Sequence, residues 1–188
     1  VIDDNKIILQ QKITQSETDK LSDNIIQSYI EIDKRLNLTK NLKSISTTIG
    51  PGSYTSLRVG SAFISGIVIS RKIPYYPLSI EDIINFNSIK HSKKNLGVFV
   101  TSSNNQEFLC YKIKDNKMKY YKIENNKYTI PKHIDLILFN KSKITEKNKL
   151  EQMKFSFFEE FFNNYNSLTF KNNIIIKPIY ISNNQLLN

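Results

Sequence analysis

The sequence predicts an α/β fold of two lobes. In the first half, long segments with apolar residues every three or four positions alternate with short apolar segments, which is the pattern of helices joined to strands. In the second half, three short segments rich in β-branched and aromatic residues follow one another across turn residues, as in an antiparallel meander. The polar segment 90–94 separates the halves, so we expect a first lobe over residues 1–90 and a smaller second lobe over residues 91–188.

The chain begins with a predicted hairpin and a long helix. Asp3–Asn5 is a cluster of turn residues, so Ile7–Ile13 is expected to form the second arm of the hairpin. Ser16 or Thr18 can cap the helix that follows, which is predicted over Glu17–Leu36. Its apolar residues recur at helical spacing and form one stripe: Leu21, Ile25, Tyr29, Ile32 and Leu36.

The next segment, Leu42–Ile49, is a predicted strand that runs directly into a turn at Gly50–Gly52. Ser53 is placed to cap a second helix, which is expected to end near Ser70. The stretch IGPGSYTSLRVGSAFISGI, residues 49–67, holds four of the five glycines and one of the three arginines of the chain. A single sharp turn that begins a closely packed helix explains this concentration.

Two of these glycines, Gly60 and Gly66, lie inside the predicted second helix. Each of them costs about 1 kcal/mol of helix stability relative to alanine. A helix usually carries glycine at such positions where another backbone comes close. We therefore expect this helix to pack tightly on one side, against its own sheet or against a partner.

The first lobe is expected to end with a strand and a third helix. Ile73–Tyr76 is a predicted strand that Pro77 ends, and Ser79, followed by two acidic residues, begins a helix that reaches toward Ile89. The predicted strands of the second half are Leu96–Val100, Glu107–Ile113, Lys117–Ile123 and Ile134–Phe139.

The last part of the chain combines an aromatic helix with an extended end. Aromatic residues at helical spacing predict a helix over Met153–Tyr165, and core packing explains them better than a ligand site. Glu159 and Glu160 are expected on its solvated face. Ile174–Ile181 is predicted to be extended.

The composition argues against reading the net charge of +10 as a dedicated polyanion site. The chain has 24 Lys against 3 Arg, together with 29 Ile and 22 Asn, which are residues whose codons are rich in A and T. Because the lysines are spread along the whole chain, solvated surface lysine is favoured over a nucleic-acid groove, and RNA contact stays open.

Cys110 lies in an apolar segment and is expected to be buried. No secretory signal or membrane-spanning segment is visible, which predicts a cytoplasmic protein.

The sequence contains few recognisable catalytic motifs. A strand, a glycine turn and a helix can present backbone N–H groups to an anion, but the spacing is neither that of a P-loop nor that of a dinucleotide-binding site. Arg58 could bind a phosphate or form an interface salt bridge, although a structural role in a tight turn is favoured on spacing alone. His91 and His133 do not form a metal-binding pair, and no nucleophile elbow occurs. Neither a catalytic set nor a metal or cofactor site is therefore predicted.

The segment IGPGSYTSLRVG, residues 49–60, closely resembles the IGPGSFTGLRIG signature of the TsaB (YeaZ-like) family, a component of the tRNA threonylcarbamoyladenosine system. Ser56 replaces a glycine of that signature. The matching residues are Gly50, Pro51, Gly52, Ser53, Tyr54, Thr55, Leu57, Arg58 and Gly60. Pro77–Glu81 and Pro178–Ile181 are also similar to family segments. Two features depart from the family: its opening strand, ILAIDTS, is absent, and Thr101 and the residues after it stand where a DAR sequence is usual.

The resemblance implies an actin-like, Hsp70-type (ASKHA) fold of two ribonuclease-H-like lobes, here lacking the first strand. It also implies a non-catalytic subunit that binds the transferase TsaD through its first two helices, with a TsaE-like ATPase joining and tRNA bound through the complex. A second copy of the chain is the other expected partner of these helices. The expected interface residues are Leu21, Ile25, Tyr29, Arg58, Gly60, Phe63, Ile64 and Ile67. No cofactor of its own is implied, and a nucleotide at the partner interface stays open.

The alternative is an enzyme of the same fold. A nucleotide-dependent phosphotransferase would use Gly50–Ser53 to hold a phosphate, and it would need acidic residues at the openings of both lobes to bind a metal. No such residue follows Val100 directly, so the non-catalytic subunit is the favoured hypothesis.

Overall fold

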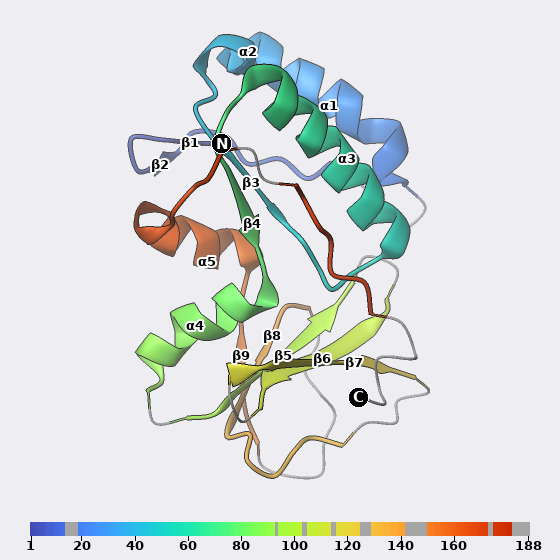
Figure 1. Ribbon diagram of the computed structural model, residues 1–188, viewed down its shortest axis with the longest axis vertical. Helices are drawn as coiled ribbons and strands as arrows, with labels where there is room; N and C mark the ends of the chain where they lie inside the picture. Colours follow the sequence, from blue (N-terminus) through green and yellow to red (C-terminus); the bar gives the residue numbers. More distant parts are fainter. Residues whose placement is uncertain are drawn as a thin grey trace.

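Figure 1 shows the computed structural model of the chain, which describes residues 1–13, 19–92, 94–102, 105–113, 116–124, 129–141, 150–172 and 175–181. Its helices are α1 (Leu21–Leu36), α2 (Leu38–Asn41), α3 (Tyr54–Arg71), α4 (Ile80–Lys90) and α5 (Phe157–Asn164), with a 3₁₀ turn at Tyr165–Ser167. Its strands are β1 (Ile2–Asp3), β2 (Lys6–Ile7), β3 (Ile45–Thr48), β4 (Tyr75–Leu78), β5 (Leu96–Thr101), β6 (Glu107–Lys112), β7 (Met118–Ile123), β8 (Leu136–Phe139) and β9 (Glu151–Lys154). No helix of the described residues is long and apolar enough to cross a membrane.

The N-terminal hairpin forms as predicted but is shorter. β1 and β2 are antiparallel, with Ile2 opposite Ile7 and Asp3 opposite Lys6. Asp4 and Asn5 form the two-residue turn with φ of 43° and 61°, a backbone conformation that Asn and Asp tolerate better than most residues. The strand ends at Ile7, so the expected arm up to residue 13 is not a strand.

The first long helix, α1, begins at Leu21. The expected capping residues Ser16 and Thr18, and the expected first residue Glu17, lie outside the described residues. Lys20 occupies the N-cap position and makes no side-chain capping hydrogen bond. Asn37, with φ of 51°, ends α1, and the short helix α2, which was not predicted, follows it directly.

Strands β3 and β4 are parallel, and β4 continues through Pro77 to Leu78. The expectation that Pro77 ends this strand is wrong. Ile45 and Ile49 of the β3 segment donate hydrogen bonds to the carbonyls of Pro74 and Leu78, so alternate residues of β4 face β3. The position of Pro77 faces away from β3, where its missing N–H breaks no ladder hydrogen bond.

The second part of the chain is a five-stranded sheet of order β7-β6-β5-β8-β9. β5, β6 and β7 form the predicted antiparallel meander, while β8 is parallel to β5 and β9 is parallel to β8. β9 was not predicted, because Met153 and Lys154 were expected in a helix. That helix, α5, begins only at Phe157, and Ser156 caps it by accepting a hydrogen bond from the Glu159 N–H.

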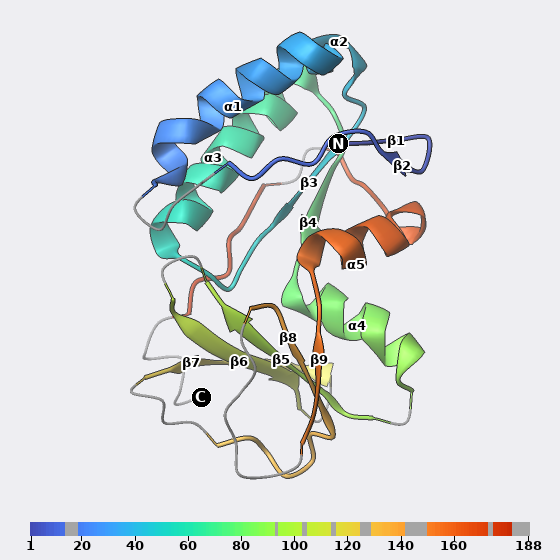
Figure 2. The ribbon, with the colours of Figure 1, turned by 180° about the vertical axis from the view of Figure 1, so that it is seen from behind.

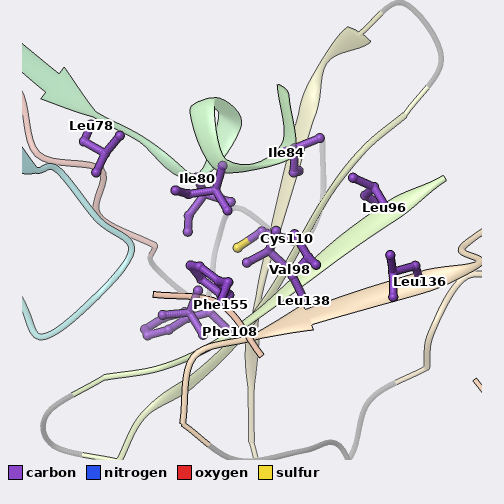
Figure 3. Packing of buried hydrophobic residues seen from close by; sticks show 12 residues of the cluster. Leu78, Ile80, Ile84, Leu96, Val98, Phe108, Cys110, Leu136, Leu138 and Phe155 are labelled. Carbon is purple, nitrogen blue, oxygen red and sulfur yellow. The ribbon is translucent and has the colours of Figure 1, made fainter. Parts of the chain in front are cut away.

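Helices α4 and α5 join the five-stranded sheet through one apolar core, part of which Figure 3 shows from close by. Its buried members are Leu78, Ile80, Ile83, Ile84, Leu96, Val98, Val100, Phe108, Cys110, Leu136, Leu138 and Phe155. Burial of Cys110 is confirmed. Helix α4 starts after Ser79, as predicted, and a capping box stabilises this start: the Ser79 hydroxyl accepts from the Asp82 N–H, and the Asp82 carboxylate accepts from the Ser79 N–H at 2.7 Å.

The acidic pair of α5 is divided between solvent and core. Glu159 is exposed, but Glu160 is buried, which corrects the expectation that both face solvent. Lys90, at the end of α4, reaches the Glu160 carboxylate at 3.1 Å and supplies the opposite charge that a buried carboxylate requires. This ion pair links α4 to α5. The lobe division at residues 90 and 91 stays a prediction, and α4 packs mainly on the second sheet.

Candidate partner interface and glycine turn

The glycine turn joins β3 to α3 and contacts the C-terminal segment 175–181. The Ile179 N–H donates to the Ile49 carbonyl at 2.6 Å. Gly50 has φ of 112°, and a Cβ at this position would lie 2.7 Å from the Ile179 carbonyl oxygen and 3.2 Å from Leu57 Cδ1. Both the backbone angle and the space therefore require glycine. Figures 1 and 2 show the C-terminal segment in the region between α3 and β3.

The first turn of α3 leaves its N-terminus without a side-chain cap. Ser53 is the N-cap residue, and its carbonyl accepts the Leu57 N–H at 2.9 Å, but its hydroxyl makes no capping bond. The predicted side-chain cap is therefore wrong. The cause is local: Ser53 has φ of −56° and ψ of 123°, whereas the capping residue Ser79 has the extended angles −106° and 167°.

Arg58 lies on the exposed side of α3, one turn after the helix start. Its guanidinium donates to the Tyr54 hydroxyl at 3.2 Å and lies 5.2 Å from the centre of that ring. The Tyr54 ring in turn packs on Tyr180, with 4.7 Å between the ring centres. Arg58 forms no ion pair with a described residue, so its contacts connect the start of α3 to the C-terminal segment.

Several of the residues expected to bind a partner lie along the contact between α1 and α3, whereas Arg58 is exposed at the start of α3 and Ile64 is half-buried on the same helix. Tyr29 and Phe63 pack edge to face with 5.5 Å between ring centres, and Leu21 approaches the position of Gly60 to 3.8 Å. Ile25 and Ile67 are buried. Partner binding by these residues stays a prediction, but the contact of Tyr29 with Phe63 and the burial of Ile25 and Ile67 use part of their apolar surface inside the chain. Figure 2 shows α1 lying alongside α3.

α1 and α3 carry exposed apolar residues that sequence reasoning missed. On α1, Ile26 is 58% exposed and Ile30 is 40% exposed, one helical turn apart. On α3, Ile69 is 75% exposed, and it lines a cavity with Ile175 and Ile176 of the C-terminal segment rather than the contact with α1. A Cβ on Gly66 would have no heavy atom within 4 Å, and one on Gly60 would make only an ordinary contact. The tight packing expected at Gly60 and Gly66 is therefore not made by the described chain. The signal for the outer surface was present in the sequence as a second apolar pair at spacing four.

The ionisable groups of the described chain mostly serve its local structure. Hydrogen bonds from the Thr39 N–H and hydroxyl lower the pKa of Asp33, and those from Asn95 lower the pKa of Asp135. Burial raises the pKa of the Cys110 thiol, which keeps it protonated and unreactive. Among the residues that the structure describes, no three His, Cys, Asp or Glu side chains lie together where they could hold a metal ion.

Comparison with known families decides the assignment of the chain. A sequence model of the family "TsaD: tRNA N6-adenosine threonylcarbamoyltransferase" matches residues 8–177. The chain belongs to this family. The reaction of the TsaD family is a tRNA modification, which agrees with the coarse part of the expected function. No curated protein matches the sequence.

Solved structures agree with this family at the level of the fold. YeaZ from Pseudomonas aeruginosa is similar with a TM-score of 0.50 and 9% identity, over 85% of this chain and 84% of that chain. An uncharacterized protein described as similar to peptidase YEAZ, from Pseudomonas aeruginosa, gives a TM-score of 0.49 and 10% identity, over 84% of this chain and 82% of that chain. The family model, together with the likeness of the fold to YeaZ at a TM-score of 0.50, confirms the resemblance to this family and the α/β, actin-like (ASKHA) fold class.

Proposed function

We propose that the chain is a non-catalytic subunit of a tRNA threonylcarbamoyladenosine system that binds a TsaD-like transferase subunit through α1 and α3. In this proposal a TsaE-like ATPase joins the complex, tRNA binds through the complex, and the chain holds no cofactor of its own. It acts in the cytoplasm, and a second copy of the chain takes the partner's place on the helix pair when the transferase is absent.

The observation that supports this proposal is the apolar surface left on the outside of the helix pair. Ile26 and Ile30 of α1 stay exposed after the inner stripe has packed between α1 and α3. An exposed apolar pair one turn apart on a helix is typical of a surface that receives another helix. Gly66 adds an open position on α3 where a partner backbone can approach closely. The IGPGSYTSLRVG motif, which begins α3, supports a TsaB-like rather than a transferase role.

The experiment is co-purification of the chain with the TsaD-like subunit of the same organism. Ile26→Glu and Ile30→Glu place a charge on the outer surface of α1 without entering the core. The matched control is Ile89→Glu, the same substitution at an 83% exposed position on α4. Each of the two α1 variants is expected to lose at least ten-fold in affinity, since a buried unpaired charge costs several kcal/mol at an interface. The control variant is expected to bind like the unchanged protein.

Activity measurements separate the proposed subunit from an enzyme. The chain alone is expected neither to hydrolyse ATP with magnesium nor to modify tRNA, and to be required when the transferase and ATPase subunits are supplied. Equal binding by the α1 variants and the control would contradict the interface. Turnover of ATP by the chain alone would instead support a nucleotide-dependent phosphotransferase.

A further inference from the structure

An exposed cluster of two tyrosines and an arginine lies where the start of α3 meets the C-terminal segment 175–181. Tyr54 is 56% exposed, and its ring packs on the Tyr180 ring at a tilt of 50° with 4.7 Å between ring centres. The Arg58 guanidinium lies 5.2 Å from the centre of the Tyr54 ring and donates to its hydroxyl at 3.2 Å. Arg58 is exposed and Tyr180 is half-buried, so all three side chains reach the surface. We call these three residues the Tyr–Arg cluster.

The Arg58 side chain is held in place while most of its hydrogen-bond donors stay free. A guanidinium carries five N–H donors. Within the described residues, Arg58 donates to the Tyr54 hydroxyl, and no carboxylate forms an ion pair with it. The contact with the Tyr54 ring orients the guanidinium plane. Arg71, near the other end of α3, is used differently, because it donates to the Leu38 carbonyl and so joins α3 to α2. An oriented guanidinium with free donors suits a planar or anionic ligand.

The surroundings of the Tyr–Arg cluster are cationic and polar. The two elements that form it, α3 and the segment 175–181, contain Arg58, Arg71 and Lys177 and no Asp or Glu. Thr55, which follows Tyr54 on the first turn of α3, is also exposed. A protein–protein hot spot is surrounded by contacts that exclude water, and the exposed apolar pair suited to such packing lies on α1 instead. The cluster therefore favours a negatively charged, hydrophilic partner over an apolar protein surface.

Single-stranded RNA has the chemistry that such a cluster recognises. Unpaired bases stack on aromatic rings and on guanidinium planes, and guanidinium N–H groups donate to the phosphates between them. A double helix keeps its bases stacked on one another, so it offers this cluster only its backbone. The combination of exposed rings with an oriented guanidinium therefore selects unpaired nucleotides.

We propose that Tyr54, Arg58 and Tyr180 bind unpaired nucleotides of an RNA. The inference rests on the proposed function for the identity of that RNA, which is the tRNA of the complex, and it adds that this chain contacts the tRNA directly. Binding itself is a property of the single chain, because all three residues belong to it.

The test is fluorescence anisotropy of the full chain with a labelled single-stranded RNA of about 12 nucleotides and with an RNA duplex of the same length. Tyr54→Ala and Arg58→Ala are each expected to weaken binding of the single strand about ten-fold, as for the loss of one stacked base. Arg58→Lys keeps the charge without the planar surface, so it is expected to lose nearly as much. The matched control is Arg35→Ala, which removes the same charge at an exposed position on α1 and should bind nearly as tightly as the unchanged protein.

The outcomes separate stacking from general attraction to charge. Preference for the single strand, together with losses in Tyr54→Ala and Arg58→Ala that Arg35→Ala does not share, supports the site. Absence of RNA binding, equal binding of the duplex, or equal losses in Arg58→Ala and Arg35→Ala overturns it. RNA binding that Arg58→Ala retains while it loses co-purification with the TsaD-like subunit assigns the cluster to a protein interface and also overturns it.

Two further measurements keep these outcomes distinct. Circular dichroism of each variant checks that the fold is retained. Binding of the TsaD-like subunit is measured separately by co-purification, so failure of RNA binding leaves the proposed partner interface standing, and failure of that interface leaves the RNA site standing.

Discussion

Substituting single glycines by alanine tests the structural role of the glycine turn. At Gly50, alanine must adopt φ of 112° and place its Cβ 2.7 Å from the Ile179 carbonyl oxygen, a backbone atom that cannot rotate away. A non-glycine residue in such a conformation costs about 1–3 kcal/mol, and the close contact adds to this cost. Gly66→Ala is the opposite case, since its Cβ would meet nothing within 4 Å and alanine is the better helix former by about 1 kcal/mol.

The expected results have opposite signs. Gly50→Ala should lower the free energy of unfolding by about 3 kcal/mol, which corresponds to about 6–12 °C in Tm for a chain of this size, and Gly66→Ala should raise it by about 0.5–1 kcal/mol. Urea unfolding followed by circular dichroism measures both. A Gly50→Ala protein as stable as the unchanged chain would refute the account of the turn. A destabilised Gly66→Ala protein would refute the open space beside Gly66.

Two further predictions concern ionisable groups. Hydrogen bonds from Asn95 lower the pKa of Asp135 in the folded state, so the ionised Asp135 stabilises the protein above about pH 4 and this stabilisation is lost as the pH falls. In urea unfolding, the Asp135→Asn variant should therefore lose less stability between neutral and acidic pH than the unchanged protein. An unchanged acid dependence would contradict this. Because Cys110 is fully buried, a thiol reagent should modify it only as fast as the protein unfolds, and immediate modification of the native protein would show that the core is open.

The parts of the fold that the sequence predicts well are those that a few neighbouring residues determine. Ser79 and Asp82 carry both halves of a capping box within four positions, and Asp4 and Asn5 suit the positive φ of a two-residue turn. Asn116 has φ of 57° before the third strand of the meander. Each of these features depends on local hydrogen bonds and backbone angles, so its sequence pattern is sufficient.

The parts that could not be predicted depend on distant pairing. Glu151–Lys154 has no strong β pattern, and it forms a strand because β8 offers a parallel edge to it. Phe155 fits the helical spacing of the aromatic residues after it, but it belongs to the core in an extended segment ahead of α5. The spacing of apolar residues indicates which side chains will be buried. The tertiary structure determines which element of the chain buries them.

The same limit explains the candidate interface. The family resemblance implied that the stripe containing Ile25 and Tyr29 faces a partner, but α3 already covers part of this stripe. Ile26 and Ile30 interleave with that stripe and extend the apolar surface of α1 past the width that one neighbouring helix can cover. The apolar surface of such a helix is buried most completely when a second neighbour packs on it. For this reason the charge substitutions at Ile26 and Ile30, rather than at the buried stripe, separate loss of a partner from loss of the fold.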